Sequence, residues 1–231
     1  MPLVVATANV EGTLSRRDAR AAVAAVLEHR PDLVALQEWH PWRAGLLRGF
    51  PDHEWYQPAL GGCAVGVRRD RFARVSHGTR LLSPPGRADR HGRVLGLEPA
   101  RLATRTVRRD LATGHTVAVV SYHLASQVQR GEGYREDDRP RLVARHRREA
   151  AALQRLVDET VTAGLPTYAC GDSNFHGFRL PGLVSVWDSF PDAGGTLGAR
   201  QVDDVHAPAA PLDVLTVATP SDHLAVVATY A

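Results

Sequence analysis

The chain has 231 residues, of which 44% are hydrophobic and 23% charged, a composition typical of a soluble globular protein and unlike that of a disordered one. It contains no lysine and no isoleucine, and all 28 basic residues are arginine. Lysine-dependent chemistry is therefore excluded, including a Schiff base, a pyridoxal phosphate site and a phosphate-binding loop ending in Gly-Lys. The same bias is typical of a GC-rich genome, so the arginine content alone is weak evidence for phosphate recognition.

The N-terminal segment MPLVVATANVEG lacks the basic start and the long apolar core of a secretion signal. No apolar run in the chain reaches the roughly 20 residues of a transmembrane helix. We therefore expect a cytoplasmic protein that does not insert into a membrane. Cys63 and Cys170 lie in separate apolar segments without the spacing of zinc ligands, so both are expected to be buried and reduced.

The first predicted strand covers residues 3–9, and a helix follows it. Ser15 is expected to be the N-cap of this helix, and Pro31 is expected to end it. The next strands are predicted over residues 32–37, 63–69, 101–107 and 116–124, where runs rich in Val, Ala and Thr are mostly bounded by Gly, Pro or Asp.

A polar, glycine-containing segment over residues 126–141 is expected to form a long loop. A second helix is predicted from about Asp138 to Thr162, with its apolar residues along one stripe. Three further strands are predicted over residues 165–172, 201–205 and 223–230. Strands outnumber helices and several are apolar on both faces, which favours an α/β sandwich of two packed sheets with helices on their outer sides.

Polar side chains gather where the predicted strands end, and the ends of strands are where open sheets usually place their ligand sites. They are Asn9, Glu11, Glu38, His123, Asp172, Asn174, Asp203, Asp204, Asp222 and His223. Each of them alone has an ordinary structural explanation, such as a cap, a turn or a buried histidine. The order in which these residues follow one another along the chain says more about function than any single residue does.

The series ANVEG, LQE, a strand ending in His-Leu, GDSN, VDDV and SDH, in this order, resembles the endonuclease/exonuclease/phosphatase superfamily. That superfamily includes deoxyribonuclease I, exonuclease III-like abasic-site endonucleases, inositol polyphosphate phosphatases and neutral sphingomyelinases. The resemblance extends from Asn9 to His223. It implies one domain over residues 1–231 with a four-layered α/β sandwich fold, in which two packed mixed β-sheets are flanked by helices.

The resemblance also implies a Mg²⁺ or Mn²⁺ cofactor. Magnesium prefers oxygen ligands and keeps several of its waters, so one or two carboxylates and the substrate phosphate suffice to hold it. Glu38 matches the principal metal carboxylate of the family, and Asn9 lies beside it as an amide. Glu11 matches an acidic residue near the metal in abasic endonucleases, and Asp222 matches a further carboxylate on the metal side.

His223 matches the base that takes a proton from the attacking water, and Asp203 matches the carboxylate that orients this histidine. The family pattern is apolar-Asp-aromatic-apolar, whereas the chain reads Val202-Asp203-Asp204-Val205. Asp204 therefore stands where an aromatic residue is usual. Adjacent residues of a strand face opposite ways, so only one of the two aspartates can point at His223, and the pattern favours Asp203.

Asp172 and Asn174 match the Gly-Asp-x-Asn pair of the family. In that pair the aspartate positions the nucleophile or protonates the leaving oxygen, and the amide donates to the phosphoryl oxygens. His123 matches a histidine that contacts the scissile phosphate in the deoxyribonuclease I branch. Together these residues would supply donors around the charge that develops on the phosphoryl group.

The segment 68–110 is strongly basic, with 12 arginines and only four acidic residues. Such an excess suits a face that meets a polyanion such as a nucleic-acid backbone. The structural alternative is a set of solvated arginines that protect edge strands. Arg101 and Arg105 are the candidate phosphate contacts, because strand alternation places both on one face.

These observations lead us to expect a metal-dependent phosphodiesterase, first of all a nuclease that hydrolyses DNA, with RNA as a second substrate. A second class is a phosphomonoesterase or phosphodiesterase for small-molecule or lipid phosphates. A third, a non-catalytic binding domain, is disfavoured by the complete set of site residues. The last motif reads Ser-Asp-His-Leu-Ala rather than Ser-Asp-His-x-Pro, and no aromatic-rich loop precedes it, which disfavours dedicated abasic-site repair. We expect a monomer without an obligate protein partner.

Overall fold

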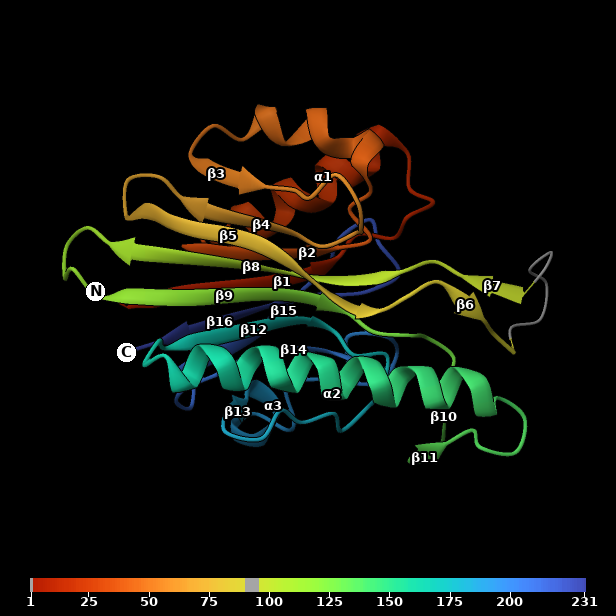
Figure 1. Cartoon of the computed structure of the whole chain (residues 1–231). Coiled ribbons are helices and arrows are strands. Elements are labelled where there is room, and N and C mark those ends of the chain that lie inside the picture. The colour runs from red at the N-terminus through yellow and green to blue at the C-terminus, as the bar shows by residue number, and fades with distance from the viewer. Residues whose placement is uncertain (1, 90–95) are drawn as a thin grey trace.

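The computed structural model describes residues 2–89 and 96–231. Two six-stranded sheets lie face to face at its centre (Figure 1). In spatial order, the first sheet contains β15 (Asp213–Val217), β16 (Ala225–Tyr230), β1 (Leu3–Asn9), β2 (Leu33–Gln37), β4 (Ala64–Arg68) and β3 (His53–Tyr56). The second contains β13 (Val184–Ser185), β14 (Asp203–Ala207), β12 (Thr167–Asp172), β9 (Thr116–His123), β8 (Arg101–Asp110) and β5 (Phe72–Ser83).

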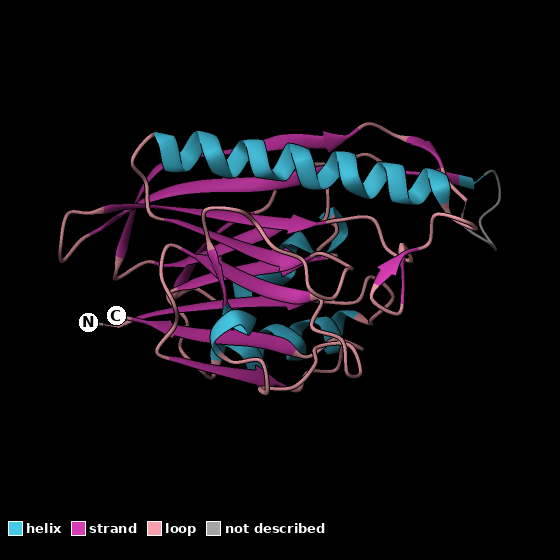
Figure 2. Ribbon diagram, turned by 90° about the horizontal axis from the view of Figure 1, so that it is seen from below, coloured by secondary structure: helices cyan, strands magenta, loops and turns pink. Residues whose placement is uncertain are grey.

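Helices cover the outer faces of both sheets, as Figures 1 and 2 show. The helix α1 (Arg16–Leu27) and the 3₁₀ helix η1 (Pro41–Gly49) pack on the first sheet. The long helix α2 (Pro140–Thr162) lies along the second sheet, and the short helix α3 (Val186–Ser189) follows β13. The expected four-layered sandwich of two mixed sheets flanked by helices is confirmed.

The core between the sheets consists of the inward side chains of both. Val5, Leu33 and Val65 of the first sheet pack against Val119 and Cys170 of the second, and all five are buried. Both faces of the central strands are covered, which is why β1, β2, β9 and β12 read as nearly continuous apolar runs. Cys63 and Cys170 are free and buried, as expected.

Both predicted helices, α1 and α2, are present, and the residues at their ends favour their start and stop. The Oγ of Ser15 accepts a hydrogen bond of 3.1 Å from the backbone N–H of Asp18 at the start of α1. Helix α2 begins with Pro140 at its first position, where the missing N–H costs nothing, and Gly164 follows its end with a φ of +74°. No helix among the described residues is both long and apolar enough to cross a membrane.

Several elements differ from the expectation. Strand β5 is a twelve-residue edge strand whose middle residues are exposed and whose pairing is irregular at two points. It was not predicted because it lacks a simple alternation of apolar and polar residues. The elements η1, β3 and β15 were not predicted either. The loop expected over residues 126–141 contains a small hairpin, β10 (Gln129–Arg130) and β11 (Gly133–Tyr134), and a second two-residue pair joins β6 (Gly86–Arg87) to β7 (Leu97–Glu98).

Parallel pairing brings the polar strand ends to one edge of the sandwich. Strands β1 and β2 run parallel, with Asn9 opposite Gln37 at their carboxyl ends. Strands β9 and β12 also run parallel, with His123 opposite Asp172. The sheets therefore present residues from distant parts of the chain at a common edge, where α/β proteins usually bind their ligands.

Candidate active site

Polar side chains at the strand ends form a cluster whose members are Asn9, Glu38, His123, Asp172, Asn174, Asp203 and His223. Asp172 lies at the centre of this cluster and is almost fully buried. Its Oδ2 accepts hydrogen bonds from the side-chain amides of Asn9 (2.9 Å) and Asn174 (3.0 Å), and its Oδ1 accepts one from the backbone N–H of Asn174 (2.6 Å). The Nε2 of His123 lies 3.4 Å from the same Oδ2. One carboxylate thus joins residues from β1, β9 and the loop after β12.

The charge of Asp172 is disfavoured by its surroundings. Burial is the main reason, and the neighbouring carboxylate of Asp203 adds to it, so that together they raise the pKa of Asp172 to about 7. His223 and the hydrogen bonds from Asn174 and Asn9 oppose this rise. A carboxyl group with a pKa near neutrality can exchange a proton during a reaction at physiological pH.

Asn174 is held in an unusual backbone conformation beside this carboxylate. Its φ of +56° lies in the left-handed region, which asparagine tolerates better than most residues. Its side-chain amide also donates to the carbonyl of Leu124 (3.1 Å), and its own carbonyl accepts from Arg200 (3.2 Å). These contacts keep the amide of Asn174 against Asp172.

A histidine–aspartate pair completes the buried side of the cluster. The Nδ1 of His223 lies 2.7 Å from the Oδ2 of Asp203, and both residues are buried. Burial alone would lower the pKa of His223, but the hydrogen bond and charge of Asp203, with help from Asp172 and Asp222, raise it to about 9. The Nδ1 contact leaves Nε2 as the nitrogen available to a substrate or water.

Asp204 points to the opposite side of β14, as strand geometry requires. Its carboxylate accepts hydrogen bonds from the Oγ of Ser185 (2.6 Å) and the backbone N–H of Val186 (3.3 Å), and it lies 3.4 Å from Nε2 of His206. Burial raises its pKa. Asp203, and not Asp204, is therefore the aspartate in contact with His223.

Glu38 follows β2 in a sharp turn with a φ of +54°. A left-handed conformation at a residue other than glycine costs roughly 1–2 kcal/mol, and such strain is typical of functional sites. Here the turn is held by a hydrogen bond of 2.7 Å from the backbone N–H of Gly12 to Oε2. The other carboxylate oxygen, Oε1, lies 3.9 Å from Nε2 of His123, so Glu38 faces the cluster from the first sheet.

The loop after β1 is fixed by two residues that the sequence analysis did not select. The buried guanidinium of Arg43 donates to the carbonyls of Val10 (2.7 Å), Glu11 (2.9 Å) and Leu14 (2.9 Å). The Oγ of Ser221 donates to the carbonyl of Asn9 (2.7 Å) and accepts from the N–H of Glu11 (3.1 Å). Ser221 belongs to the SDH motif, whereas nothing in the sequence separates Arg43 from the other arginines.

The two outer carboxylates lie at the rim. Glu11 is half-buried and accepts a hydrogen bond from the hydroxyl of Thr13. Asp222 is exposed and accepts one from Ser221 (3.3 Å). Glu11 and Asp222 are close in sequence to Asn9 and His223, respectively. Among the described residues, however, neither makes the hydrogen bonds at the centre of the cluster.

The cluster has the properties of a cation site. One ligand atom each of Asp172, Asp203 and His223 lies within 4.8 Å of the other two. The Oδ1 atoms of Asn9 and of Asp203 are buried and accept no hydrogen bond from the described residues. Buried oxygens without a donor are costly unless something else satisfies them, and a divalent cation with oxygen ligands would do so.

Arg101 and Arg105, the two candidate phosphate contacts, lie in different parts of the structure. The Nη1 of Arg101 lies 3.1 Å from Nδ1 of His123, at the edge of the cluster. Arg105 instead lines a shallow depression together with Arg80 and with Leu156 and Glu159 of α2. Alternation along β8 did not show this separation, because Arg101 is the first residue of the strand and lies beside an irregular pairing at Ser83.

Much of the basic stretch is neutralised by acids from elsewhere in the chain. Five of its arginines form ion pairs outside the stretch: Arg68 and Arg71 with Asp32, Arg74 and Arg108 with Glu54, and Arg80 with Glu159. The excess of arginine in the sequence is therefore not an equal excess of uncompensated charge on the surface. At these positions the structural explanation of the arginines holds.

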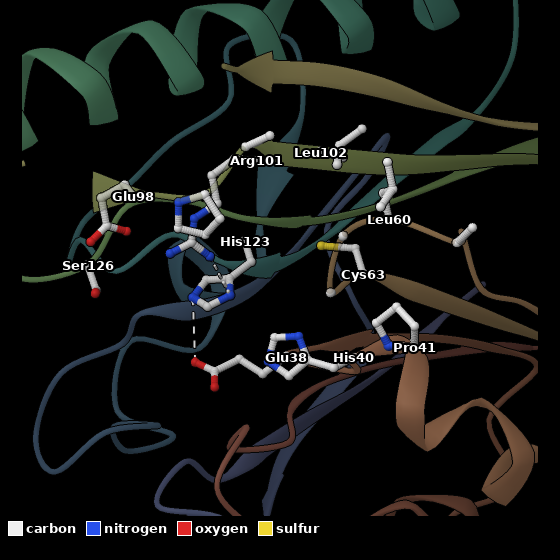
Figure 3. A pocket seen from close by; sticks show the side chains of 15 residues that line it. Glu38, His40, Pro41, Leu60, Cys63, Glu98, Arg101, Leu102, His123 and Ser126 are labelled. Carbon is white, nitrogen blue, oxygen red and sulfur yellow. Dashed lines mark hydrogen bonds and ion pairs between the residues drawn. The ribbon is translucent and has the colours of Figure 1, made fainter. Parts of the chain in front are cut away.

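A pocket of about 350 Å³ opens directly beside the cluster (Figure 3). Glu38, His123, Arg101, Glu98 and Ser126 are among its polar lining residues, and Pro41, Leu60 and Leu102 are among its apolar ones. His40 also lines the pocket and stacks on Trp42, with ring centroids 4.3 Å apart. The cluster thus has a polar centre with a partly apolar cavity next to it.

Comparison with known proteins shows which protein family the chain belongs to. A sequence profile described as the Endonuclease/Exonuclease/phosphatase family matches residues 6–223. That range includes every residue of the cluster. A search of the curated proteins finds no match.

Solved structures resemble the chain over its whole length at low sequence identity. TDP2 of D. rerio, solved with a single-strand DNA product, is 15% identical, with a TM-score of 0.70 over 100% of this chain and 99% of that one. The human Nocturnin catalytic domain with a bound sulfate is 17% identical, with a TM-score of 0.71 over 100% and 93%. A family protein of Bacteroides thetaiotaomicron is 17% identical, with a TM-score of 0.70 over 99% and 97%. At these identities the likeness shows the fold.

Proposed function

The chain belongs to the endonuclease/exonuclease/phosphatase family of metal-dependent phosphoesterases, and we propose that it is a nuclease that hydrolyses phosphodiester bonds of DNA and, as a second substrate, RNA. The observation that carries the proposal is the 2.7 Å contact between His223 and Asp203, with Asp172 beside it. A buried imidazole oriented by a carboxylate can serve as the general base that activates a water for attack on a phosphodiester.

In the proposed reaction, His223 removes a proton from the attacking water through Nε2. Asp203 accepts the hydrogen bond from Nδ1–H, which selects the tautomer with a free Nε2 and stabilises the imidazolium that forms. The proton moves from water to Nε2 as the water oxygen bonds to phosphorus. The bond from phosphorus to the leaving oxygen breaks on the opposite side.

We assign the divalent metal, Mg²⁺ or Mn²⁺, to Glu38 and Asn9, with Glu11 and Asp222 as outer carboxylates. The buried Oδ1 of Asn9 without a donor and the partly exposed carboxylate of Glu38 support this assignment. When bound, the ion would neutralise charge on the phosphoryl oxygens and on the leaving oxygen. Asp172, Asp203 and His223 also satisfy the geometry of a cation site, and the variants proposed below separate the two assignments.

The remaining residues would hold the substrate. The imidazole of His123, whose Nε2 lies 3.4 Å from Asp172, would donate an N–H to a phosphoryl oxygen. The side-chain amide of Asn174 donates to Leu124 and Asp172 and would exchange one of these bonds for one to a phosphoryl oxygen. Asp172, whose pKa of about 7 allows it to carry a proton, is placed to protonate the leaving oxygen. Arg101, beside His123, adds a positive charge.

A nucleic-acid substrate is favoured over the alternatives by two observations. The fold is shared with TDP2, one structure of which holds a single-strand DNA product. The cluster also opens onto a pocket of about 350 Å³, which is larger than a single phosphate group requires. We further propose that residues 1–231 act as one catalytic domain, since segments far apart in the chain contribute to the site.

A panel of substrates tests this function. Purified protein with Mg²⁺ or Mn²⁺ should nick plasmid DNA and cleave single-stranded DNA, with RNA as a slower substrate, and should not turn over phosphoinositides. Turnover of a phosphoinositide or another small phosphate ester, without any cleavage of nucleic acid, would favour the phosphatase alternative and contradict the nuclease.

Arg101→Ala is expected to lower kcat/KM for DNA by about 10- to 100-fold, the usual effect of losing one charge-assisted hydrogen bond. Arg105→Ala is the matched control, since Arg105 lies on the same strand but away from the cluster. It should leave kcat/KM unchanged. Steady-state kinetics at several salt concentrations check the prediction, because loss of a phosphate contact also flattens the salt dependence by about one unit of log–log slope. Equal losses in both variants would contradict the role of Arg101.

A further inference from the structure

We propose that the pocket beside Glu38 and His123 binds the nucleobase next to the scissile phosphate, so that the enzyme cleaves unpaired nucleic acid faster than base-paired nucleic acid. The inference rests on the proposed nuclease function and names its substrate more closely.

The position of the pocket is the first argument. Its polar lining includes Glu38 and His123 of the cluster and Arg101 at the edge of the cluster, besides His40, Glu98 and Ser126 (Figure 3). A phosphodiester placed against these residues has a nucleoside on each side of the phosphate. One of the two nucleosides must therefore lie at or in the pocket.

The size of the pocket is the second argument. Its volume of about 350 Å³ is near the lower end of the 300–1,000 Å³ typical of small-molecule sites. Such a volume suits one ring system with part of its sugar. A base pair, which carries two ring systems and a second backbone, does not fit.

The walls of the pocket are the third argument. Leu60 and Leu102 lie side by side in the wall of the pocket, and Pro41 also lines it (Figure 3). Leu60 is 74% exposed, so its apolar surface is free to contact a ligand. The ring of His40 lines the pocket and is backed by Trp42, which stacks on its face with ring centroids 4.3 Å apart. Apolar and aromatic surfaces of this kind contact the faces of bases without reading their sequence.

A base inside a duplex cannot reach this pocket unless it leaves its stack and its partner. Extruding a base costs a few kcal/mol, and the cost is smallest where the base is already unpaired. Single strands, loops and frayed ends therefore enter the site most readily. The substrate class that follows is unpaired nucleic acid.

An abasic scan tests the inference on the wild-type enzyme. A single-stranded DNA oligonucleotide is compared with a series in which one nucleoside at a time is replaced by an abasic tetrahydrofuran residue, and with its full duplex. The abasic residue next to the cleaved bond should raise KM for that bond by roughly 5- to 100-fold, the range typical of losing one stacked base. The duplex should be cleaved more slowly than the single strand by at least the same factor.

Two variants locate the effect in the pocket. Leu60→Ala removes an exposed side chain from its rim, and Ala59→Trp fills it from an exposed position. Both should raise KM for the intact oligonucleotide and reduce the ratio of KM between abasic and intact substrates. Leu212→Ala is the matched control, because Leu212 is 61% exposed and lies next to β15, at the other end of the first sheet. It should change neither value.

The outcomes separate this inference from the proposed function. Cleavage of intact, abasic and duplex substrates with the same KM would contradict nucleobase binding in the pocket and would still support the nuclease function. Absence of cleavage of every oligonucleotide, with turnover of a small phosphate ester, would overturn both. Binding to vesicles of anionic phospholipid that Leu60→Ala weakens, together with indifference to the abasic residue, would assign the apolar wall to a membrane and overturn the pocket proposal.

Discussion

Glu38→Ala is expected to abolish metal-dependent turnover, with a loss on the order of 10³-fold or more, because the ion is worth several kcal/mol of transition-state stabilisation. The side chain is 32% exposed and its main contact is the N–H of Gly12, so the fold should remain intact. Turnover of single-stranded DNA with saturating Mg²⁺ measures the loss, and circular dichroism checks the fold. Excess chelator should reproduce the effect in the wild type.

Glu28→Ala, at the exposed end of α1, is the matched control and should retain full activity. Activity of the wild-type enzyme in excess chelator would show that the metal assignment is wrong. Asp172→Ala should also be inactive, but Asp172 is buried and supports the left-handed backbone of Asn174. A loss of stability is therefore expected in that variant and not in Glu38→Ala, so Glu38 is the cleaner test.

His223→Ala is expected to reduce turnover by about 10²- to 10⁴-fold, the usual contribution of a positioned general base. Asp203→Asn should be severe as well, because an amide can present the wrong partner to Nδ1 and carries no charge to stabilise the imidazolium. Steady-state kinetics with saturating metal measure both losses. If His223 were instead mainly a metal ligand, excess metal would restore much of the activity of His223→Ala.

The pH dependence gives a second measurement on the same pair. The base acts unprotonated, so kcat/KM falls as the pH drops through the pKa of His223. That pKa is raised from 6.5 to about 9 by Asp203, and a bound divalent cation opposes protonation, so the acidic limb should lie between 6.5 and about 9. The limb should vanish in His223→Ala and move to lower pH in Asp203→Asn, which lacks the charge that raises the pKa.

Asp204→Asn controls for a general effect of losing an aspartate from β14. Asp204 faces Ser185 and His206 on the other side of the strand, so the variant should lose stability and keep its turnover per folded molecule and its acidic limb. An Asp204→Asn enzyme with a shifted limb, or a limb unchanged in His223→Ala, would contradict the assignment of the base.

Much of the fold could be predicted because the central strands are buried on both faces and therefore read as continuous apolar runs. The cluster could be selected because its residues stand at strand ends, and parallel pairing of β1 with β2 and of β9 with β12 brings those ends to one edge. Strand β5 was not predicted from the sequence, because its two irregular pairings and its exposed middle residues remove the alternation of apolar and polar residues that marks a strand.

Other features of the site depend on contacts that a sequence does not display. Arg43 fixes the loop after β1 through three backbone carbonyls, and carbonyls are the same for every residue type. The separation of Arg101 from Arg105 depends on a local irregularity of β8 pairing. The raised pKa of His223 requires three carboxylates at known distances, which only the folded chain defines.

The pairing of β1 with β16 has a consequence for the synthesis of the enzyme. Leu3 lies opposite Tyr230, and the hydroxyl of Ser221 bonds to the carbonyl of Asn9, 212 residues earlier in the chain. Contacts of such long range form late and slowly during folding. A nascent chain that has not reached His223 lacks both the proposed base and the partner strand of β1, so the unfinished protein on the ribosome has no complete active site.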